Sequence, residues 1–219
     1  MRNGKIELVF ILDCSGSMHG YEVDTIGGFN SMLRKQKKEG KEVYVTTFLF
    51  NHECKKFHDR LNIHSVEEMR EEDYSVSGCT ALLDAVGEAI EHILNVHKYI
   101  RKEDLPEHTL FVITTDGFEN ASRTYSFKKI RTAISQQKEN GWEFLFLAAD
   151  LDAVAMSESL GIGRNRAASF HKDRRGIERA FNIVSRVCSA FPEQGGVSEW
   201  WKKELDEDFH DRTKSHLSN

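Results

Sequence analysis

The sequence predicts an α/β protein with a doubly wound, mostly parallel sheet, one antiparallel edge strand and helices on both faces, a Rossmann-like arrangement. Four apolar runs, at residues 6–12, 43–50, 109–115 and 144–149, are continuous rather than alternating. Continuous runs are typical of strands that are covered on both faces. Stretches with helical periodicity lie between them, and strands that alternate with helices form right-handed β-α-β units with a parallel sheet.

Four helices are predicted from apolar residues that recur at every third or fourth position. They cover residues 23–33, 82–94, a stretch that follows Ser126 and stops before Gly141, and residues 177–188. Serine is a common N-cap residue and glycine commonly ends a helix, so both bounds of the third helix are marked.

The sheet is expected to have an antiparallel edge. The run at 43–50 is followed by the short polar stretch NHECKKFHDRLNI instead of a helix, which suggests a hairpin with a partner strand at 54–58. An antiparallel edge strand is common on an otherwise parallel sheet. Residues 167–170 are expected to form a last short strand.

We expect a domain at residues 1–192 and a charged C-terminal extension at residues 193–219, either a short helix or partly disordered. The extension contains Trp200 and Trp201. Exposed tryptophans usually have a partner, so this pair is expected to dock on the domain or to contact another protein.

The composition excludes several classes of protein. A net charge of −5 with interspersed signs gives no basic face for nucleic acid. The apolar run after MRNGKIE is too short for a signal-peptide core or a membrane span, and no later run approaches the length that a span requires. The four cysteines are scattered and indicate neither a disulfide framework nor a zinc ribbon. We therefore expect a cytoplasmic protein with reduced thiols.

Five residues with metal-ligating oxygens occur where strands end or helices begin. Asp13, Ser15 and Ser17 follow the first strand at alternate positions, Thr80 precedes the second helix, and Asp116 follows the third long strand. Sites in open α/β sheets lie outside the carboxyl ends of the strands, so these side chains should meet. Two carboxylates and three hydroxyls suit Mg²⁺ or Mn²⁺. Two negative charges balance a divalent ion and leave it able to accept one more anionic oxygen.

These motifs together resemble the von Willebrand factor A (vWA) domain family and its metal-ion-dependent adhesion site (MIDAS). The resemblance rests on the DxSxS pattern in ILDCSGSM, on Thr80 before a helix and on Asp116 and Gly117 after a strand, and it extends over about residues 6–190. TALLDAVGEAI and VITTDGFENAS are similar to stretches of bacterial, intracellular, stand-alone members. Cys79 departs from the glycine that many members have there, at a position without a ligand role.

The resemblance implies a role for each residue and a class of partner. Ser15 and Ser17 would bind the metal directly, and Thr80 directly or through water. Asp13 and Asp116 would act largely through water or by orienting the hydroxyls. A glutamate or aspartate of a partner protein would complete the metal shell. The protein would then be a binding module and not an enzyme, and related intracellular proteins act beside ATP-driven machines or within multi-protein complexes.

Other interpretations of these residues remain open. Asp13 or Ser15 could cap the next helix in a degenerate, metal-free domain. Asp13 could also be a nucleophile for phosphoryl groups, which requires a second acid and a lysine nearby; the position two residues on is Ser15, which is not an acid. A serine hydrolase is disfavoured because no GxSxG motif is present. The candidate ligands for a zinc site are His52, Cys54, His58 and His64, whose spacing fits no standard zinc pattern.

Overall fold

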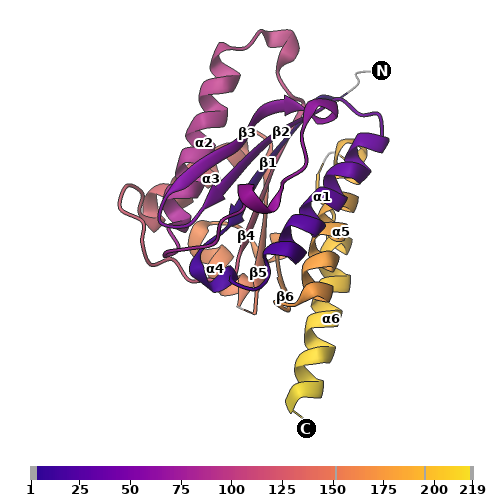
Figure 1. The fold of residues 1–219 in the computed structure, drawn as a ribbon. Helices are drawn as coiled ribbons and strands as arrows, with labels where there is room; N and C mark the ends of the chain where they lie inside the picture. The colour runs from indigo at the N-terminus through magenta and orange to yellow at the C-terminus, as the bar shows by residue number, and fades with distance from the viewer. Residues whose placement is uncertain (1–3, 151, 195, 218–219) are drawn as a thin grey trace.

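One six-stranded sheet forms the centre of the protein (Figure 1). The computed structural model describes residues 4–150, 152–194 and 196–217. The strand order is β3-β2-β1-β4-β5-β6, and every neighbouring pair is parallel except β2 and β3. The predicted fold class is therefore confirmed, including the antiparallel edge.

The strands are β1 (Ile6–Asp13), β2 (Val43–Phe50), β3 (Cys54–Asn62), β4 (His108–Thr115), β5 (Trp142–Ala149) and β6 (Ala167–Phe170). The helices are α1 (Glu22–Lys38), α2 (Leu82–Tyr99), α3 (Phe127–Glu139), α4 (Ala153–Leu160), α5 (Arg174–Gln194) and α6 (Trp200–Leu217). Short 3-10 helices are η1 (Gly16–Met18), η2 (Ile63–Ser65), η3 (Glu71–Asp73), η4 (Lys102–Asp104) and η5 (Arg164–Arg166).

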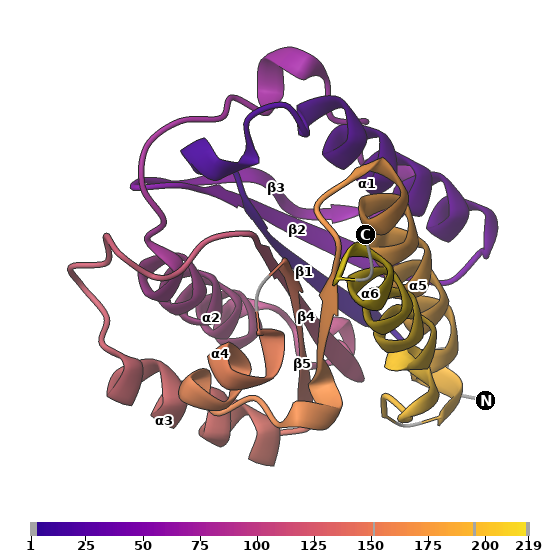
Figure 2. The same cartoon turned by 90° about the horizontal axis from the view of Figure 1, so that it is seen from below.

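Helices cover both faces of the sheet (Figure 2). The layer of α1, α5 and α6 shares one apolar cluster with the sheet, and the layer of α2, α3 and α4 shares a second. Successive side chains of a strand point to opposite faces, so Phe10 and Leu12 of β1 enter the first cluster while Val9 and Ile11 enter the second. This two-sided burial explains why the strands are continuous apolar runs in the sequence.

The helix α4 was not predicted, although its end signals are present. The side chain of Asp152 accepts a hydrogen bond from the Ala155 N–H at 3.0 Å, as an N-cap does. Gly161 ends the helix with a φ of +84°, a conformation that glycine adopts without strain. With only eight residues, the helix is too short to show a clear apolar period.

The C-terminal helix α6 packs on β6 and α5, and its end projects beyond the sheet (Figure 1). Trp201 is fully buried, and its indole N–H donates to the Asn165 carbonyl at 2.9 Å. Trp200 is 41% exposed, with the Arg186 guanidinium 5.9 Å from its ring centroid. One tryptophan of the pair therefore docks on the domain. Residues 195, 218 and 219 of the extension lie outside the described residues, and the division at residue 192 stays a prediction.

None of the helices in the described ranges is both long and apolar enough to cross a membrane.

His58 is a buried histidine of β3 that is held in its neutral form. Its Nδ1 lies 3.0 Å from Thr47 Oγ1 and its Nε2 lies 3.1 Å from the Glu67 carbonyl oxygen. A carbonyl can only accept, so we assign the ring proton to Nε2 and let Nδ1 accept from the Thr47 hydroxyl. Burial lowers the pKa of His58 below its ordinary value of 6.5.

Replacement of His58 by glutamine should weaken the dependence of stability on acid pH. The unfolded chain binds a proton at this residue more readily than the folded protein does, so the wild type loses stability as pH falls below 6.5. The contribution of one such group is at most about 1.4 kcal/mol per pH unit. Urea unfolding between pH 7.5 and 5.5 measures the slope, with exposed His64→Gln as the control. Equal slopes for the His58 variant and the wild type would refute this assignment.

Candidate metal centre

Three loops meet at the carboxyl end of the sheet and carry the five residues predicted to bind a metal. The loop after β1 is tied to the loop before α2 by two backbone hydrogen bonds, from Gly16 N–H to the Gly78 carbonyl at 2.9 Å and from Ser77 N–H to the Cys14 carbonyl at 3.0 Å. β4 lies directly beside β1, so the loop after β4 reaches the same place. The structure brings together Asp13, Ser15, Ser17, Thr80 and Asp116.

The Ser17 hydroxyl lies at the centre of the site, between Ser15, Thr80 and Asp116. Its Oγ donates to Asp116 Oδ1 at 2.6 Å and lies 3.1 Å from Ser15 Oγ. A Cβ atom added at Gly117 would lie 2.8 Å from Thr80 Oγ1 and 3.6 Å from Ser17 Oγ. The Thr80 and Ser17 hydroxyls therefore border the same point, and a larger residue than glycine at 117 would crowd the threonine.

Asp13 is buried, and both of its carboxylate oxygens accept hydrogen bonds. Oδ1 accepts from the Ser15 N–H at 2.7 Å, and Oδ2 accepts from Thr115 Oγ1 at 2.6 Å. Burial raises the pKa of this carboxyl, and the hydrogen bonds from Thr115 and Ser15 oppose that rise. The Asp13 carbonyl also accepts from the Tyr74 hydroxyl. Asp13 is thus fixed by its neighbours and in turn fixes the loop that carries the two serines.

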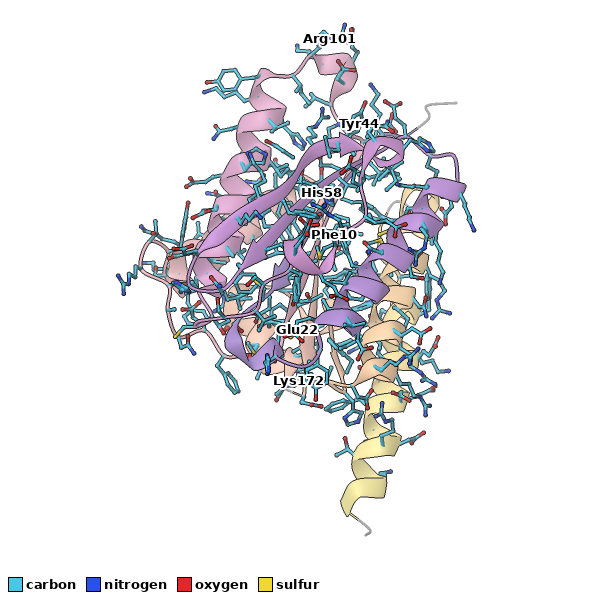
Figure 3. The ribbon with its side chains drawn as sticks, in the orientation of Figure 1. Phe10, Glu22, Tyr44, His58, Arg101 and Lys172 are labelled. Carbon is cyan, nitrogen blue, oxygen red and sulfur yellow. The ribbon has the colours of Figure 1, made fainter. Side chains whose placement is uncertain are left out.

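Lys172 is a sixth residue of the site, and the sequence analysis missed it. It lies in the loop between β6 and α5, and its Nζ is 3.2 Å from Asp116 Oδ2 and 3.3 Å from the Ser17 carbonyl oxygen. In Figure 3 Lys172 lies at the end of the sheet opposite Arg101. Lys172 lies two residues after the end of β6. The strand-end rule draws attention to this loop, but no motif distinguishes the lysine from the other polar residues there.

The donor set fits a hard divalent cation. All candidate ligand atoms are carboxylate or hydroxyl oxygens, the type that Mg²⁺ and Mn²⁺ prefer. The Asp116 side chain has no exposed surface, and a positive group, the Lys172 ammonium, already lies against it. The residues present therefore fit a divalent cation in both charge and ligand type.

The structure contradicts the capping role suggested for Asp13 or Ser15 and the suggested zinc site. α1 begins at Glu22 after Tyr21, and the Ser15 side chain makes no capping hydrogen bond, so neither Asp13 nor Ser15 caps that helix. In the ranges 4–150, 152–194 and 196–217, no three His, Cys, Asp or Glu side chains converge as a metal cluster, so the alternative of a zinc site at His52, Cys54, His58 and His64 is wrong. Both ring nitrogens of His58 already have partners.

Comparison with solved structures identifies the fold. The PilB minor pilin from Streptococcus sanguinis aligns with a TM-score of 0.62 and 12% identity over 84% of this chain and 61% of the pilin. The vWF domain of the type V pili tip protein Mfa5 from Porphyromonas gingivalis gives 0.60 and 10%, over 85% of this chain and 95% of that domain. The chain has a von Willebrand factor A-like fold. This vWA-like chain spans about three fifths of the pilin's length.

A third structural neighbour carries a metal at a MIDAS motif of its own. It is proximal thread matrix protein 1 from the mussel byssus with a zinc-occupied MIDAS motif, at a TM-score of 0.57 and 11% identity over 84% of this chain and 46% of that one. No family model and no curated protein matches the sequence. At identities this low the structural likeness shows the fold alone.

Proposed function

We propose that this vWA-like protein is a divalent-metal-dependent protein-binding module. Mg²⁺ or Mn²⁺ held by Asp13, Ser15, Ser17, Thr80 and Asp116 would bind an acidic residue of a partner protein. The observation that supports the proposal is the meeting of three hydroxyls and two carboxylates at the carboxyl end of the sheet. Two carboxylates only balance the charge of the ion, which leaves it able to accept a further anionic oxygen.

Each of these five residues has its own part in the proposed site. Ser15 and Ser17 would bind the metal directly, and Thr80 would bind it directly or through a water molecule. Asp116 orients the Ser17 hydroxyl, and Asp13 holds the loop through the Ser15 N–H and Thr115. The metal, when bound, supplies a Lewis-acid position for the partner's carboxylate.

Mg²⁺ or Mn²⁺ should raise the thermal midpoint of the protein. A free metal concentration of about ten times the dissociation constant adds about 1.4 kcal/mol to stability, which is a rise of about 3–6 °C for a chain of this size. Ser15→Ala and Asp116→Ala should remove most of the rise, whereas exposed Ser135→Ala on α3 should keep it. If the thermal midpoint rises neither in the wild type nor in a Lys172→Met variant, which lacks the ammonium beside Asp116, the result would count against the metal site.

Affinity capture from the native cell tests the partner. A metal-dependent partner should be retained with Mg²⁺, lost with a chelator, and lost with the Asp116→Ala protein even when Mg²⁺ is present. The proposal includes a cytoplasmic location beside an ATP-driven or multi-protein complex. The four cysteines, which are all free, support the cytoplasmic part of this proposal. A partner set that does not respond to the chelator would contradict metal-dependent binding.

A phosphate-transferring hydrolase is the second candidate, because Lys172 is the kind of group that would hold a transferred phosphate. Two observations disfavour it. Both carboxylate oxygens of Asp13 are engaged by hydrogen bonds, and Ser15 stands where this chemistry needs an acid. Release of phosphate from an aryl phosphate, abolished by Asp13→Asn, would replace the binding proposal with this one.

A further inference from the structure

We propose that Lys172 is a built-in cation that competes with the metal for the negative charge of Asp116. This inference rests on the proposed function, because it concerns the same centre. It adds a residue with an opposing role to the five that would bind the ion.

The first argument is electrostatic. The Asp116 side chain has no exposed surface, while the Lys172 side chain is 23% exposed and reaches it from the rim of the site. A buried carboxylate is costly unless a positive partner or hydrogen bonds compensate it. The Lys172 ammonium supplies that compensation at 3.2 Å, together with the Ser17 hydroxyl on the other oxygen.

The second argument is that the ammonium bridges two of the metal-site loops. It contacts Asp116 Oδ2 after β4 and the Ser17 carbonyl oxygen after β1. It also lies 5.3 Å from the centroid of the Tyr21 ring, within the range of a cation–π contact. A divalent ion bound by the Ser15 and Ser17 hydroxyls would lie close to this ammonium, because Ser17 Oγ bonds to one oxygen of Asp116 and Lys172 Nζ bonds to the other. Two positive charges at such short range repel each other. Metal binding would therefore displace the Lys172 ammonium.

The third argument is that both neighbours of Lys172 are anchored to α6. The His171 ring stacks on Phe209 with centroids 4.6 Å apart, and its Nε2 is 3.2 Å from the Phe209 carbonyl oxygen. On the other side, Asp173 accepts from the Arg212 guanidinium. These contacts anchor the backbone on both sides of Lys172, so the fold keeps the lysine next to Asp116 while its side chain stays able to turn away.

Calorimetric titration with Mn²⁺ tests the inference on the full chain. Lys172→Met keeps a long apolar side chain beside Tyr21 and removes the charge, so it should bind the ion about tenfold more tightly than the wild type. Lys172→Arg keeps the charge and should remain close to the wild type. Exposed Lys203→Met on α6 is the matched control and should leave the affinity unchanged. Equal or weaker binding by Lys172→Met would overturn the inference.

The titration also separates this inference from the proposed function. If the wild type and Lys172→Met bind Mn²⁺ equally, the metal site stands and only the competition fails. If neither binds, the site holds no metal and both proposals fail. Tight binding by the variant with weak binding by the wild type supports both.

A second measurement needs no substitution at the site. Lysine acetylation by a small reagent, followed by mass spectrometry, reports how freely the Lys172 amine reaches solvent. At a saturating concentration of Mn²⁺ the rate at Lys172 should rise, while the rate at Lys203 should not change. An unchanged rate at Lys172 in the metal-saturated protein would show that the amine does not move away, contrary to the inference.

Discussion

Replacing Arg60 by methionine should lower the free energy of unfolding by about 3–5 kcal/mol, the usual cost of leaving a buried charge without its partner. The partner is Glu7, which lies near the start of β1 and has no exposed side-chain surface. Arg60 Nε donates to Glu7 Oε2 at 2.9 Å, and Arg60 Nη2 donates to the Asp104 carbonyl at 3.0 Å. The guanidinium also stacks over Tyr44 at 4.4 Å from the ring centroid. Urea unfolding at pH 7.5 measures the change.

The double variant Glu7→Met, Arg60→Met distinguishes an unpaired charge from lost packing. Removing both charges leaves apolar side chains of similar length, so the double variant should recover most of the stability that the single variant loses. Exposed Arg70→Met, which breaks ion pairs with Glu72 and Asp73 at the surface, is the control and should change stability little. If the double variant is as unstable as Arg60→Met, the loss of stability comes from the lost packing contacts of Arg60 and not from the unpaired Glu7 charge.

Glu7 illustrates what the sequence could and could not predict about the fold. A glutamate inside the apolar run IELVFIL indicates that a buried strand contains a charge, and a buried charge requires a partner. The partner lies 53 positions away, on β3, which runs to Asn62 where the predicted strand stopped at 58. Strand runs follow from local composition, whereas a single contact between distant residues leaves no periodic pattern.

The same distinction applies to the metal centre. Asp13, Ser15, Ser17, Thr80 and Asp116 could be predicted to meet, because adjacent parallel strands end at one edge of the sheet. Lys172 belongs to no motif, and only the order β4-β5-β6 brings its loop back toward Asp116. Its positive charge compensates the buried Asp116 carboxylate. In the sequence, nothing distinguishes this lysine from a solvated lysine in a polar loop.

The helix α6 was only partly predictable because its buried face contains a charge. Trp201, Leu205 and Asp208 are buried at successive turns, but an aspartate breaks the apolar pattern that marks an amphipathic helix. The carboxylate is compensated by Arg175 and Arg179 of α5. A charged sequence therefore conceals a helix that docks on the domain, where a partly disordered extension was one of the two expectations.

Replacing Trp201 by alanine should lower the free energy of unfolding by about 3–5 kcal/mol, as for other large buried aromatic residues. The indole is fully buried and donates to the Asn165 carbonyl, so the substitution leaves both a cavity and a carbonyl without its donor. Trp200→Ala is the matched control, because this neighbouring side chain is exposed and its replacement should cost much less. Thermal and urea unfolding measure both variants.

The Trp201 result also decides whether α6 unfolds with the domain. If α6 were an independent extension, Trp201→Ala would leave the main unfolding transition where it is in the wild type. If α6 is part of the cooperative unit, the whole transition shifts to lower temperature. The contacts of Phe209 and Arg212 with the residues on either side of Lys172 favour the second outcome. In that case the stability of the C-terminal helix and the position of the lysine at the metal centre depend on the same packing.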